Sequence, residues 1–153
     1  MNIRRARPSD AEAISALIHG QRDLFLLSPV GPATTAFLCA TSSDRILEHI
    51  QSPERAVFVA TNDGHVIACM SIKSTRHVSQ FFVHPDHQRQ GIGRALWNAA
   101  DLELGLSRVG QVVTVDSSFY AVPVYRRLGF VECGPAAERD GFRYVPMSRA
   151  NDA

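Results

Sequence analysis

Runs of β-branched and other apolar residues in the middle of the chain predict a series of strands. Residues 56–61 (AVFVAT) and 66–72 (VIACMSI) flank the turn signal Asn62-Asp63-Gly64, a combination that predicts a hairpin. Residues 77–83 predict a third consecutive strand. Shorter strand-like segments lie at residues 2–7, 111–116, 130–133 and 142–148. We therefore expect about six to seven strands in one sheet.

Apolar residues at helical spacing predict the helices between these strands. The sequence SDAE at residues 9–12 matches a capping box and precedes the first helix. Residues 28–42 are rich in Pro, Gly and small residues, and residues 44–50 have helical periodicity, so we expect a loop and one or two helices there. Further helices are predicted over residues 91–106 and 120–128. The core-facing positions expected in the helix over residues 91–106 are Ile92, Ala95, Leu96, Ala99, Ala100 and Leu102.

The order of these elements predicts one domain over residues 1–153. A strand and helices come first, followed by three consecutive strands, a helix, a strand, a second helix and two final strands. This order is typical of an α/β (α+β) fold with a mixed, mostly antiparallel central sheet flanked by helices. A chain of 153 residues is long enough to bury a core without disulfides or metals, as a monomer or as a homodimer.

Composition excludes several classes of partner. The net charge of +1 provides no overall attraction to nucleic acid or to an anionic membrane. No segment approaches the roughly 20 apolar residues of a membrane span, and the first residues lack the apolar stretch of a signal peptide. Cys39, Cys69 and Cys133 are odd in number and far apart, which argues against a disulfide framework or a zinc site. We therefore expect a cytoplasmic protein without a bound metal.

The segment at residues 80–96 (QFFVHPDHQRQGIGRAL) carries the chemistry that the other segments lack. It joins a strand to a helix through a polar, glycine-containing loop. Amides at the start of a helix have no internal acceptors and bind anions, which glycines allow to approach closely. A nucleotide-binding P-loop is excluded because no Lys-Ser/Thr pair follows Gly93. A dinucleotide fingerprint is disfavoured because Leu96 stands where Gly or Ala is needed and the loop is long.

Two motifs resemble those of the GNAT superfamily of N-acetyltransferases. The first is Val83-His84-Pro85 followed by Gln88-x-x-Gly91-x-Gly93, which is similar to the family's acetyl-CoA motif. The second is residues 117–130 (SSFYAVPVYRRLGF), where a tyrosine on a helix precedes Leu-Gly-Phe. The spacing of the motifs and the order of the elements extend the resemblance over essentially the whole chain.

The resemblance implies a binding site for acetyl-CoA as co-substrate. Amides of residues 89–94 are then expected to hold the pyrophosphate, with charge-assisted contacts from the loop arginines. The strand before the loop is expected to diverge from its neighbour and present backbone groups to the thioester and the pantetheine arm. The residues implied are Phe81, Phe82, Val83, Gln88, Arg89, Gln90, Gly91, Ile92, Gly93, Arg94 and Ser118. Ser118 stands where many relatives have Asn, which leaves that contact open.

The resemblance also implies two catalytic residues. Tyr125 matches the tyrosine whose hydroxyl lies near the sulfur of CoA, although it could instead be a packing residue. His77 matches the position at which several relatives place a general base, and alternation along the strand predicts that His77, Ser79 and Phe81 share one face. The alternative for His77 is a partly exposed histidine at the start of a strand.

The function implied is transfer of an acetyl group from acetyl-CoA to a primary amine of a small molecule or peptide. Two alternatives remain open at this point: a CoA-binding sensor without turnover, and an acyltransferase that uses another acyl-CoA. The bulky Phe81 and Phe82 favour acetyl over larger acyl groups. Phe25, Phe37 and Leu38 are expected to line the acceptor pocket.

Overall fold

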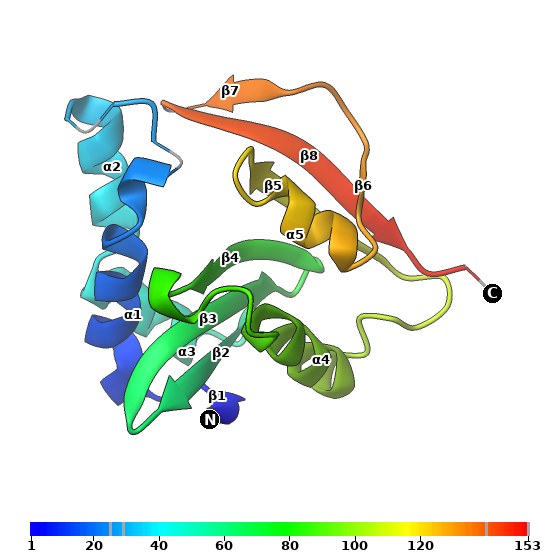
Figure 1. Ribbon diagram of the computed structural model, residues 1–153, viewed down its shortest axis with the longest axis horizontal. Coiled ribbons are helices and arrows are strands. Elements are labelled where there is room, and N and C mark those ends of the chain that lie inside the picture. The colour runs from blue at the N-terminus through cyan, green and yellow to red at the C-terminus, as the bar shows by residue number, and fades with distance from the viewer. Residues whose placement is uncertain (25, 29, 140, 153) are drawn as a thin grey trace.

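A computed structural model of the chain describes residues 1–24, 26–28, 30–139 and 141–152 (Figure 1). The main strands and helices follow one another in the predicted order. The elements are β1 (Asn2–Arg5), η1 (Pro8–Asp10), α1 (Ala11–His19), η2 (Arg22–Leu24), α2 (Pro32–Ala40), α3 (Ser43–Gln51), β2 (Arg55–Asn62), β3 (His65–Lys73), β4 (His77–Val83), η3 (Pro85–His87), α4 (Ile92–Leu104), β5 (Val112–Ser118), α5 (Val122–Arg127), β6 (Val131–Glu132), β7 (Ala137–Arg139) and β8 (Phe142–Ala150).

The strands of the described residues form one mixed sheet in the order β1-β2-β3-β4-β5-β8-β6, with β7 also paired to β8. Every neighbouring pair is antiparallel except β4 and β5, which are parallel. The predicted mixed, mostly antiparallel α/β sheet is therefore confirmed. The sheet has eight strands, more than expected, because β7 consists of three exposed residues without an apolar pattern.

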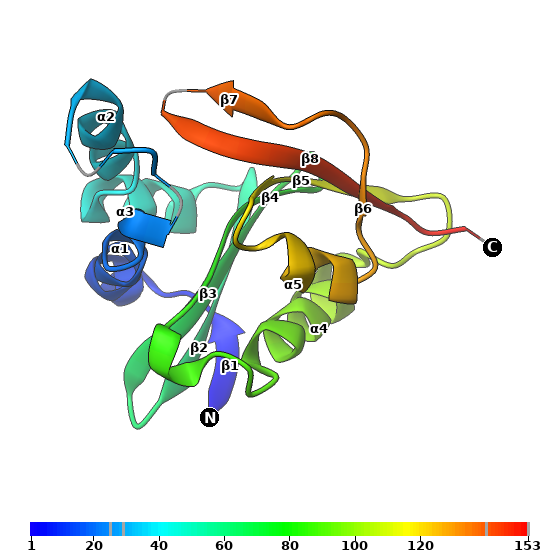
Figure 2. The same cartoon turned by 45° about the horizontal axis from the view of Figure 1, so that its top comes forward.

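Helices cover both faces of the sheet (Figure 2). α4 and α5 pack on one face in an apolar cluster that includes Phe58, Met70, Leu96 and Tyr125. α1 and α3 pack on the other face against Val57, Val59 and Cys69. We call these the α4 face and the α1 face. Figures 1 and 2 both place α2 beside the start of β8, where the Leu27 amide donates to the Gly141 carbonyl at 3.0 Å.

The local turn signals explain how the strands and helices meet. In the β2–β3 hairpin, Asp63 and Gly64 both have positive φ (50° and 79°), which is the backbone twist that a two-residue hairpin loop needs. The capping box predicted at residues 9–12 is not formed. The carboxylate of Asp10 instead accepts the Arg7 amide at 2.7 Å and pairs with Arg4 at 2.7 Å. This pairing with Arg4 lowers the pKa of Asp10.

The helix after the glycine loop is shorter than predicted, since α4 ends at Leu104. Its buried stripe contains Ile92, Leu96, Trp97 and Ala100. Leu102 was predicted to face the core, but it is 90% exposed because its position on the helix lies away from this stripe. No helix among the described residues has the length and apolar character that a membrane crossing needs.

Candidate active site

A cleft opens where the two parallel strands of the sheet separate. β4 and β5 are paired only at His77 with Thr114 and at Val78 with Val115, although both strands continue beyond these positions. The resulting cleft has a volume of about 460 Å³ and is lined by residues of β4, β5, α2 and α5, with Arg139 at the end of β7 and Phe142 at the start of β8. The divergence of β4 from its neighbour, which the resemblance implied, is present.

Backbone groups of β4 face this gap. The His84 amide donates to the Ile67 carbonyl of β3 at 2.8 Å. In an antiparallel pair, the residues whose amides bond to the neighbouring strand alternate along the chain. The Phe82 amide therefore also points toward β3, like that of His84. The amides of Phe81 and Val83 point the other way, toward β5. The Val83 carbonyl accepts the side-chain amide of Gln88 at 3.0 Å. The Phe81 amide is thus positioned to donate to a group inside the cleft.

The loop after β4 presents a series of backbone amides. The first helical hydrogen bond of α4 runs from the Ala95 amide to the Gly91 carbonyl, and the amides of residues 89–94 donate to no acceptor in the described part of the chain. Arg89 and Gly91 have left-handed φ values of 62° and 78°, which turn these amides in one direction. At Gly93, a Cβ atom would lie 3.3 Å from Cζ of Phe81. The loop therefore has the properties of an anion site.

The polar side chains of the loop differ in what they do. Arg94 donates from Nη2 to the Arg127 carbonyl at the end of α5, at 2.7 Å, so its guanidinium joins two helices. Arg89 is exposed and forms no hydrogen bond or ion pair within the described residues, which makes it the loop cation available to a phosphate. Gln88 bridges β4 to Tyr120, whose hydroxyl donates to Oε1 of Gln88 at 2.9 Å. Gln90 donates weakly to the Asp86 carbonyl at 3.5 Å.

Tyr125 lies at the floor of the cleft on the α4 face. Its ring packs edge-to-face against Phe81 and Phe130, with centroids 5.8 Å and 5.4 Å away. Burial raises the pKa of Tyr125 well above its ordinary value, so the phenol keeps its proton. Tyr125 is among the residues that line the cleft, and its hydroxyl forms no hydrogen bond with another described residue. The residue is both a packing residue and a possible donor to a bound ligand.

Ser118 lies at the end of β5 and lines the same cleft. Its hydroxyl accepts the Ala121 amide at 3.2 Å, an interaction that stabilises the turn before α5. The side chain predicted to contact the pantetheine arm therefore has a structural partner already.

A β-bulge in β4 changes the face on which His77 lies. Ile72 pairs with Val78 and Ser71 pairs with Gln80, so Ser79 has no opposite residue. Val78 and Phe81 pack on the α4 face, whereas His77 and Phe82 belong to the α1 face. The prediction that His77 and Phe81 share a face is wrong, because it assumed strict alternation through the strand. His77 and Tyr125 consequently approach the gap from opposite sides.

The surroundings of His77 favour a neutral imidazole. Nδ1 lies 2.8 Å from Oγ1 of Thr114, and Nε2 lies 4.0 Å from a carboxylate oxygen of Asp116. Burial lowers the pKa of His77, and Lys73 and Arg139 lower it further, while Asp116 acts in the opposite direction. In the tautomer in which Nδ1 donates to Thr114, Nε2 carries the lone pair that accepts a proton. His77 therefore has the properties of a base at neutral pH.

Three charged residues of the cleft were missed by the sequence analysis: Lys73, Asp116 and Arg139. Asp116 of β5 pairs with Arg139 of β7 at 3.4 Å, and the two residues are 23 positions apart in the sequence. Asp116 stands at the end of the apolar run QVVTV, and a carboxylate at that place is the one signal that could have identified it. The positions of Lys73 and Arg139 depend on the pairing of distant strands.

The apolar wall of the cleft is only partly the one expected. Phe37 of α2 lines it, as predicted, together with Leu26 and Phe142. Leu38 does not line it. Phe25 lies outside the described residues.

Cysteine chemistry and metal binding are not suggested by the described residues. Cys39 and Cys133 are exposed and do not line the cleft, whereas Cys69 is buried in the sheet, and burial raises the pKa of its thiol to about 12. A thiol that stays protonated at neutral pH is a poor nucleophile. The described residues contain no cluster of three or more His, Cys, Asp or Glu side chains that could hold a metal ion.

Comparison with known proteins agrees with this arrangement. Residues 24–150 match the family model of the acetyltransferase (GNAT) domain. A curated relative, an uncharacterized N-acetyltransferase of Chlorobaculum tepidum, is 29% identical over 136 residues, which cover 85% of this chain and 75% of the relative.

Solved structures share the fold at low sequence identity. A GCN5-related N-acetyltransferase from Rhodopseudomonas palustris superposes with a TM-score of 0.77 and 20% identity, covering 97% of this chain and 94% of that one. The PaiA N-acetyltransferase from Thermoplasma acidophilum, solved in complex with coenzyme A, has a TM-score of 0.74 and 15% identity, covering 97% and 98% of the two chains. These structures show the fold alone.

Proposed function

The chain belongs to the GNAT acetyltransferase family, and we propose that it transfers the acetyl group of acetyl-CoA to a primary amine by direct attack in a ternary complex. The observation that carries this proposal is the divergence of β4 from β5 directly before a loop whose amides have no acceptors. The gap suits an extended chain between two strands. The loop suits the phosphates at the end of that chain.

The residues present fit the binding of acetyl-CoA. Amides of residues 89–94, at the positive end of α4, would hold the pyrophosphate, and Arg89 would add a charge-assisted contact. The backbone of residues 81–83 and the turn at Ser118 would line the path of the pantetheine arm. Acetyl-CoA supplies the thioester carbonyl carbon that an amine attacks.

The Phe81 amide is proposed to stabilise the negative charge that develops on the thioester oxygen. It points into the gap and has no partner on β5. A donor that is already oriented before the reaction does not have to reorganise in the transition state. The rings of Phe81 and Tyr125 pack edge-to-face beside this point.

His77 is proposed to remove the proton that the amine must lose. An amine with a pKa near 10 loses its proton at a cost of roughly 4 kcal/mol at pH 7. The neutral Nε2 of His77 accepts it from the α1 face of the gap, directly or through a water molecule. The N–C bond forms as the C–S bond breaks, and the electron pair of that bond leaves with the sulfur.

Tyr125 is proposed to donate a hydrogen bond to the departing sulfur from the α4 face. Complete proton transfer from a phenol to a thiolate is uphill by roughly 2 kcal/mol with ordinary pKa values. Burial raises the pKa of Tyr125 and makes transfer still less favourable. The buried hydroxyl therefore acts by hydrogen bonding without giving up its proton.

Two other functions remain as alternatives for the same fold. A sensor would bind CoA without turnover, and another acyltransferase would use a larger acyl group. The ring of Phe81, held between Gly93 and Tyr125, narrows the gap on the α4 face and favours acetyl.

The proposed function is tested by following thiol release from acetyl-CoA with a panel of amines, together with the melting temperature in the presence of CoA. We expect enzyme-dependent thiol release with at least one amine and a higher melting temperature with CoA. A thermal shift without thiol release from any amine would favour the sensor. Faster release from a longer acyl-CoA would favour the second alternative.

A further inference from the structure

A row of polar residues crosses the sheet on the α1 face next to the proposed reaction centre. Arg55 of β2 is the register partner of Lys73 of β3, Lys73 is the partner of His77, and His77 is the partner of Thr114. Residues opposite each other on neighbouring strands have Cβ atoms about 5 Å apart and share a face. Lys73 therefore stands beside the proposed base, and Arg55 stands beside Lys73 on the next strand.

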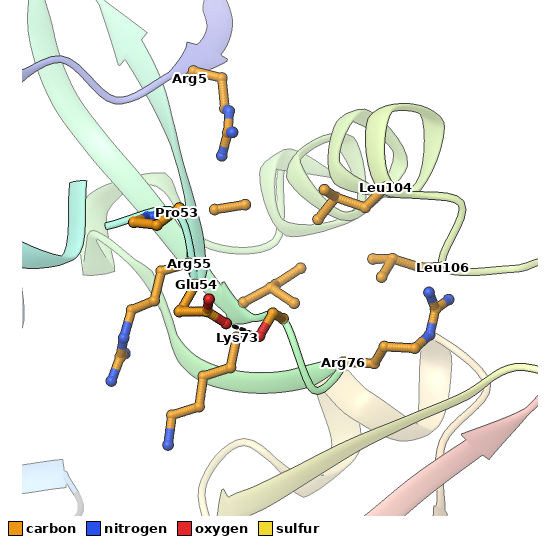
Figure 3. A pocket seen from close by; sticks show the side chains of 11 residues that line it. Arg5, Pro53, Glu54, Arg55, Lys73, Arg76, Leu104 and Leu106 are labelled. Carbon is orange, nitrogen blue, oxygen red and sulfur yellow. Dashed lines mark hydrogen bonds between the residues drawn. The ribbon is translucent and has the colours of Figure 1, made fainter. Parts of the chain in front are cut away.

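Figure 3 shows these cations from the other side of the sheet. Arg55 and Lys73 are among the residues that line a hollow under α4, but their side chains point the same way, away from Leu104 and Leu106 of that hollow. Nη1 of Arg55 donates to Oγ of Ser79 at 3.2 Å, and Ser79 lines the cleft. Lys73 itself lines the cleft, whereas Arg55 is not part of its lining and reaches its edge through the hydrogen bond to Ser79. The charged ends of both residues thus belong to the α1 face.

These two charges are not compensated by carboxylates. In the described part of the chain, neither Arg55 nor Lys73 forms an ion pair. Asp116 is paired with Arg139, while Glu54 accepts from Ser74 at the hollow drawn in Figure 3. Burial lowers the pKa of Arg55, as expected for a cation that lacks a compensating charge. On α3, Glu48 is paired with Arg45.

The opposite wall of the cleft is apolar. It consists of Leu26, Phe37 and Phe142 with small residues of α2 between them, including Ala33 and Ala36. The acceptor side of the cleft therefore combines a neutral base, the uncompensated cation Lys73 one strand away from it, a second cation, Arg55, at the edge of the cleft, and an apolar wall. A polycationic acceptor would have to place its additional charges against Arg55 and Lys73.

We propose that the acceptor is an apolar α-amino acid whose carboxylate binds Lys73 and Arg55, whose amine lies at His77, and whose side chain packs on Phe37 and Phe142. This inference rests on the proposed function. In an α-amino acid the amine and the carboxylate are separated by a single carbon, which matches the adjacency of His77 and Lys73 on neighbouring strands. The carboxylate also offers two oxygens to two donors.

The kinetic test compares acceptors that differ only in charge. Leucine and phenylalanine are compared with leucinamide and phenylalaninamide, and with spermidine and kanamycin as polycations, at saturating acetyl-CoA. We expect kcat/KM to be at least about tenfold higher for an amino acid than for its amide, which corresponds to about 1.4 kcal/mol. Lys73→Met should remove this preference, Lys73→Arg should keep most of it, and Arg126→Met, which removes an exposed charge outside the cleft, should leave it unchanged.

A second measurement does not depend on turnover. Lys73 is the only lysine of the chain, so its reaction with an amine-selective ester can be followed by mass spectrometry on the peptide that contains it. N-acetyl-leucine and N-acetyl-leucinamide carry no amine and do not consume the reagent. With CoA present, we expect N-acetyl-leucine to slow the labelling of Lys73 and N-acetyl-leucinamide to have no such effect.

The outcomes separate this inference from the proposed function. Equal kcat/KM for amino acids and amides, faster reaction of spermidine or kanamycin, or equal labelling of Lys73 with both N-acetyl compounds would overturn the amino-acid inference. Faster thiol release with a polycation than with the amino acids would overturn the amino-acid inference while supporting the acetyltransferase function. Protection of Lys73 by N-acetyl-leucine without thiol release from any amine would support the carboxylate site and contradict the proposed function.

Discussion

The ring of Phe81 occupies the space into which a side chain at Gly93 would extend. A Cβ atom on Gly93 would lie 3.3 Å from Cζ and 3.5 Å from Cε1 of this ring. The strand that faces the gap and the helix that begins at the loop are therefore packed together at a position without a side chain. This contact fixes the first turn of α4 relative to the Phe81 amide.

Gly93→Val is expected to separate fold stability from ligand binding. The added methyl groups overpack the contact with Phe81, which typically costs about 1–3 kcal/mol. The loop amides should shift with the helix, so that most of the thermal stabilisation by acetyl-CoA is lost. At a ligand concentration 100 times the dissociation constant, that stabilisation is about 2.7 kcal/mol in the native protein. Asn98→Ala, on the exposed side of the same helix, is the control. A folded Gly93→Val protein that keeps the full thermal stabilisation by acetyl-CoA would contradict the assignment of the phosphate site.

Gly91→Ala tests the backbone conformation of the loop, whereas Gly93→Val tests the space available to a side chain. Nothing lies within 4 Å of a Cβ atom at this position, but φ is +78°. A left-handed conformation costs a residue with a Cβ atom about 1–2 kcal/mol. We expect a loss of stability of this size in chemical denaturation, and a smaller loss for Gly91→Asn because Asn tolerates this conformation better. An unchanged denaturation midpoint for Gly91→Ala would show that the loop relaxes into another conformation.

His77→Ala is expected to reduce the rate mainly below the pKa of the acceptor amine, because the base is needed only while the amine is protonated. The pKa of His77 is lowered by burial, with Lys73 and Arg139 adding to the effect and Asp116 opposing it. The imidazole therefore stays neutral below the ordinary value of about 6.5, and the acidic limb of the pH–rate profile should lie below that pH. The measurement is kcat/KM between pH 5 and pH 10. A loss that does not vary with pH would indicate that His77 has a structural role.

Tyr125→Phe should lower kcat with little change in the affinity for acetyl-CoA. The substitution retains the packing on Phe81 and Phe130 and removes only the hydroxyl. An interaction formed with the departing sulfur is stronger in the transition state than in the bound thioester, so its loss appears in kcat. Acid catalysis typically contributes about 100- to 10,000-fold, and we expect the lower part of that range because the proton is not transferred. The rate is measured in a single turnover, so that slow product release does not mask a slower chemical step. An unchanged single-turnover rate in Tyr125→Phe would mean that the thiolate leaves without help from the hydroxyl.

The sequence was sufficient for the order of the elements and for the location of the glycine loop, because these depend on local patterns. The hairpin turn and the helix start at Gly91 are both local signals. The face of His77 could not be predicted, since the bulge at Ser79 arises from how β3 and β4 pair. Leu102 is exposed because its position on α4 lies away from the packed stripe.

The acceptor side of the cleft was the part least accessible from sequence. Lys73, Asp116 and Arg139 come from three strands and meet only when the whole sheet has formed. The ion pair between Asp116 and Arg139 leaves Lys73 without a carboxylate partner in the described part of the chain, and this balance of charge cannot be read from any one segment. Similarly, Arg94 matched the loop motif, but its guanidinium binds the end of α5.

Direct attack of the amine in a ternary complex is tested by one experiment with two additions. The protein is mixed with acetyl-CoA alone while free thiol and the intact mass of the protein are followed, and the acceptor amine is then added. We predict no thiol above the background and an unchanged protein mass before the amine is added, because the Cys69 thiol is buried with a pKa of about 12 and the exposed Cys39 and Cys133 do not line the cleft. After the amine is added, we predict equal amounts of free thiol and acetylated amine. A stoichiometric release of thiol before the amine, together with an acetylated protein, would contradict direct transfer.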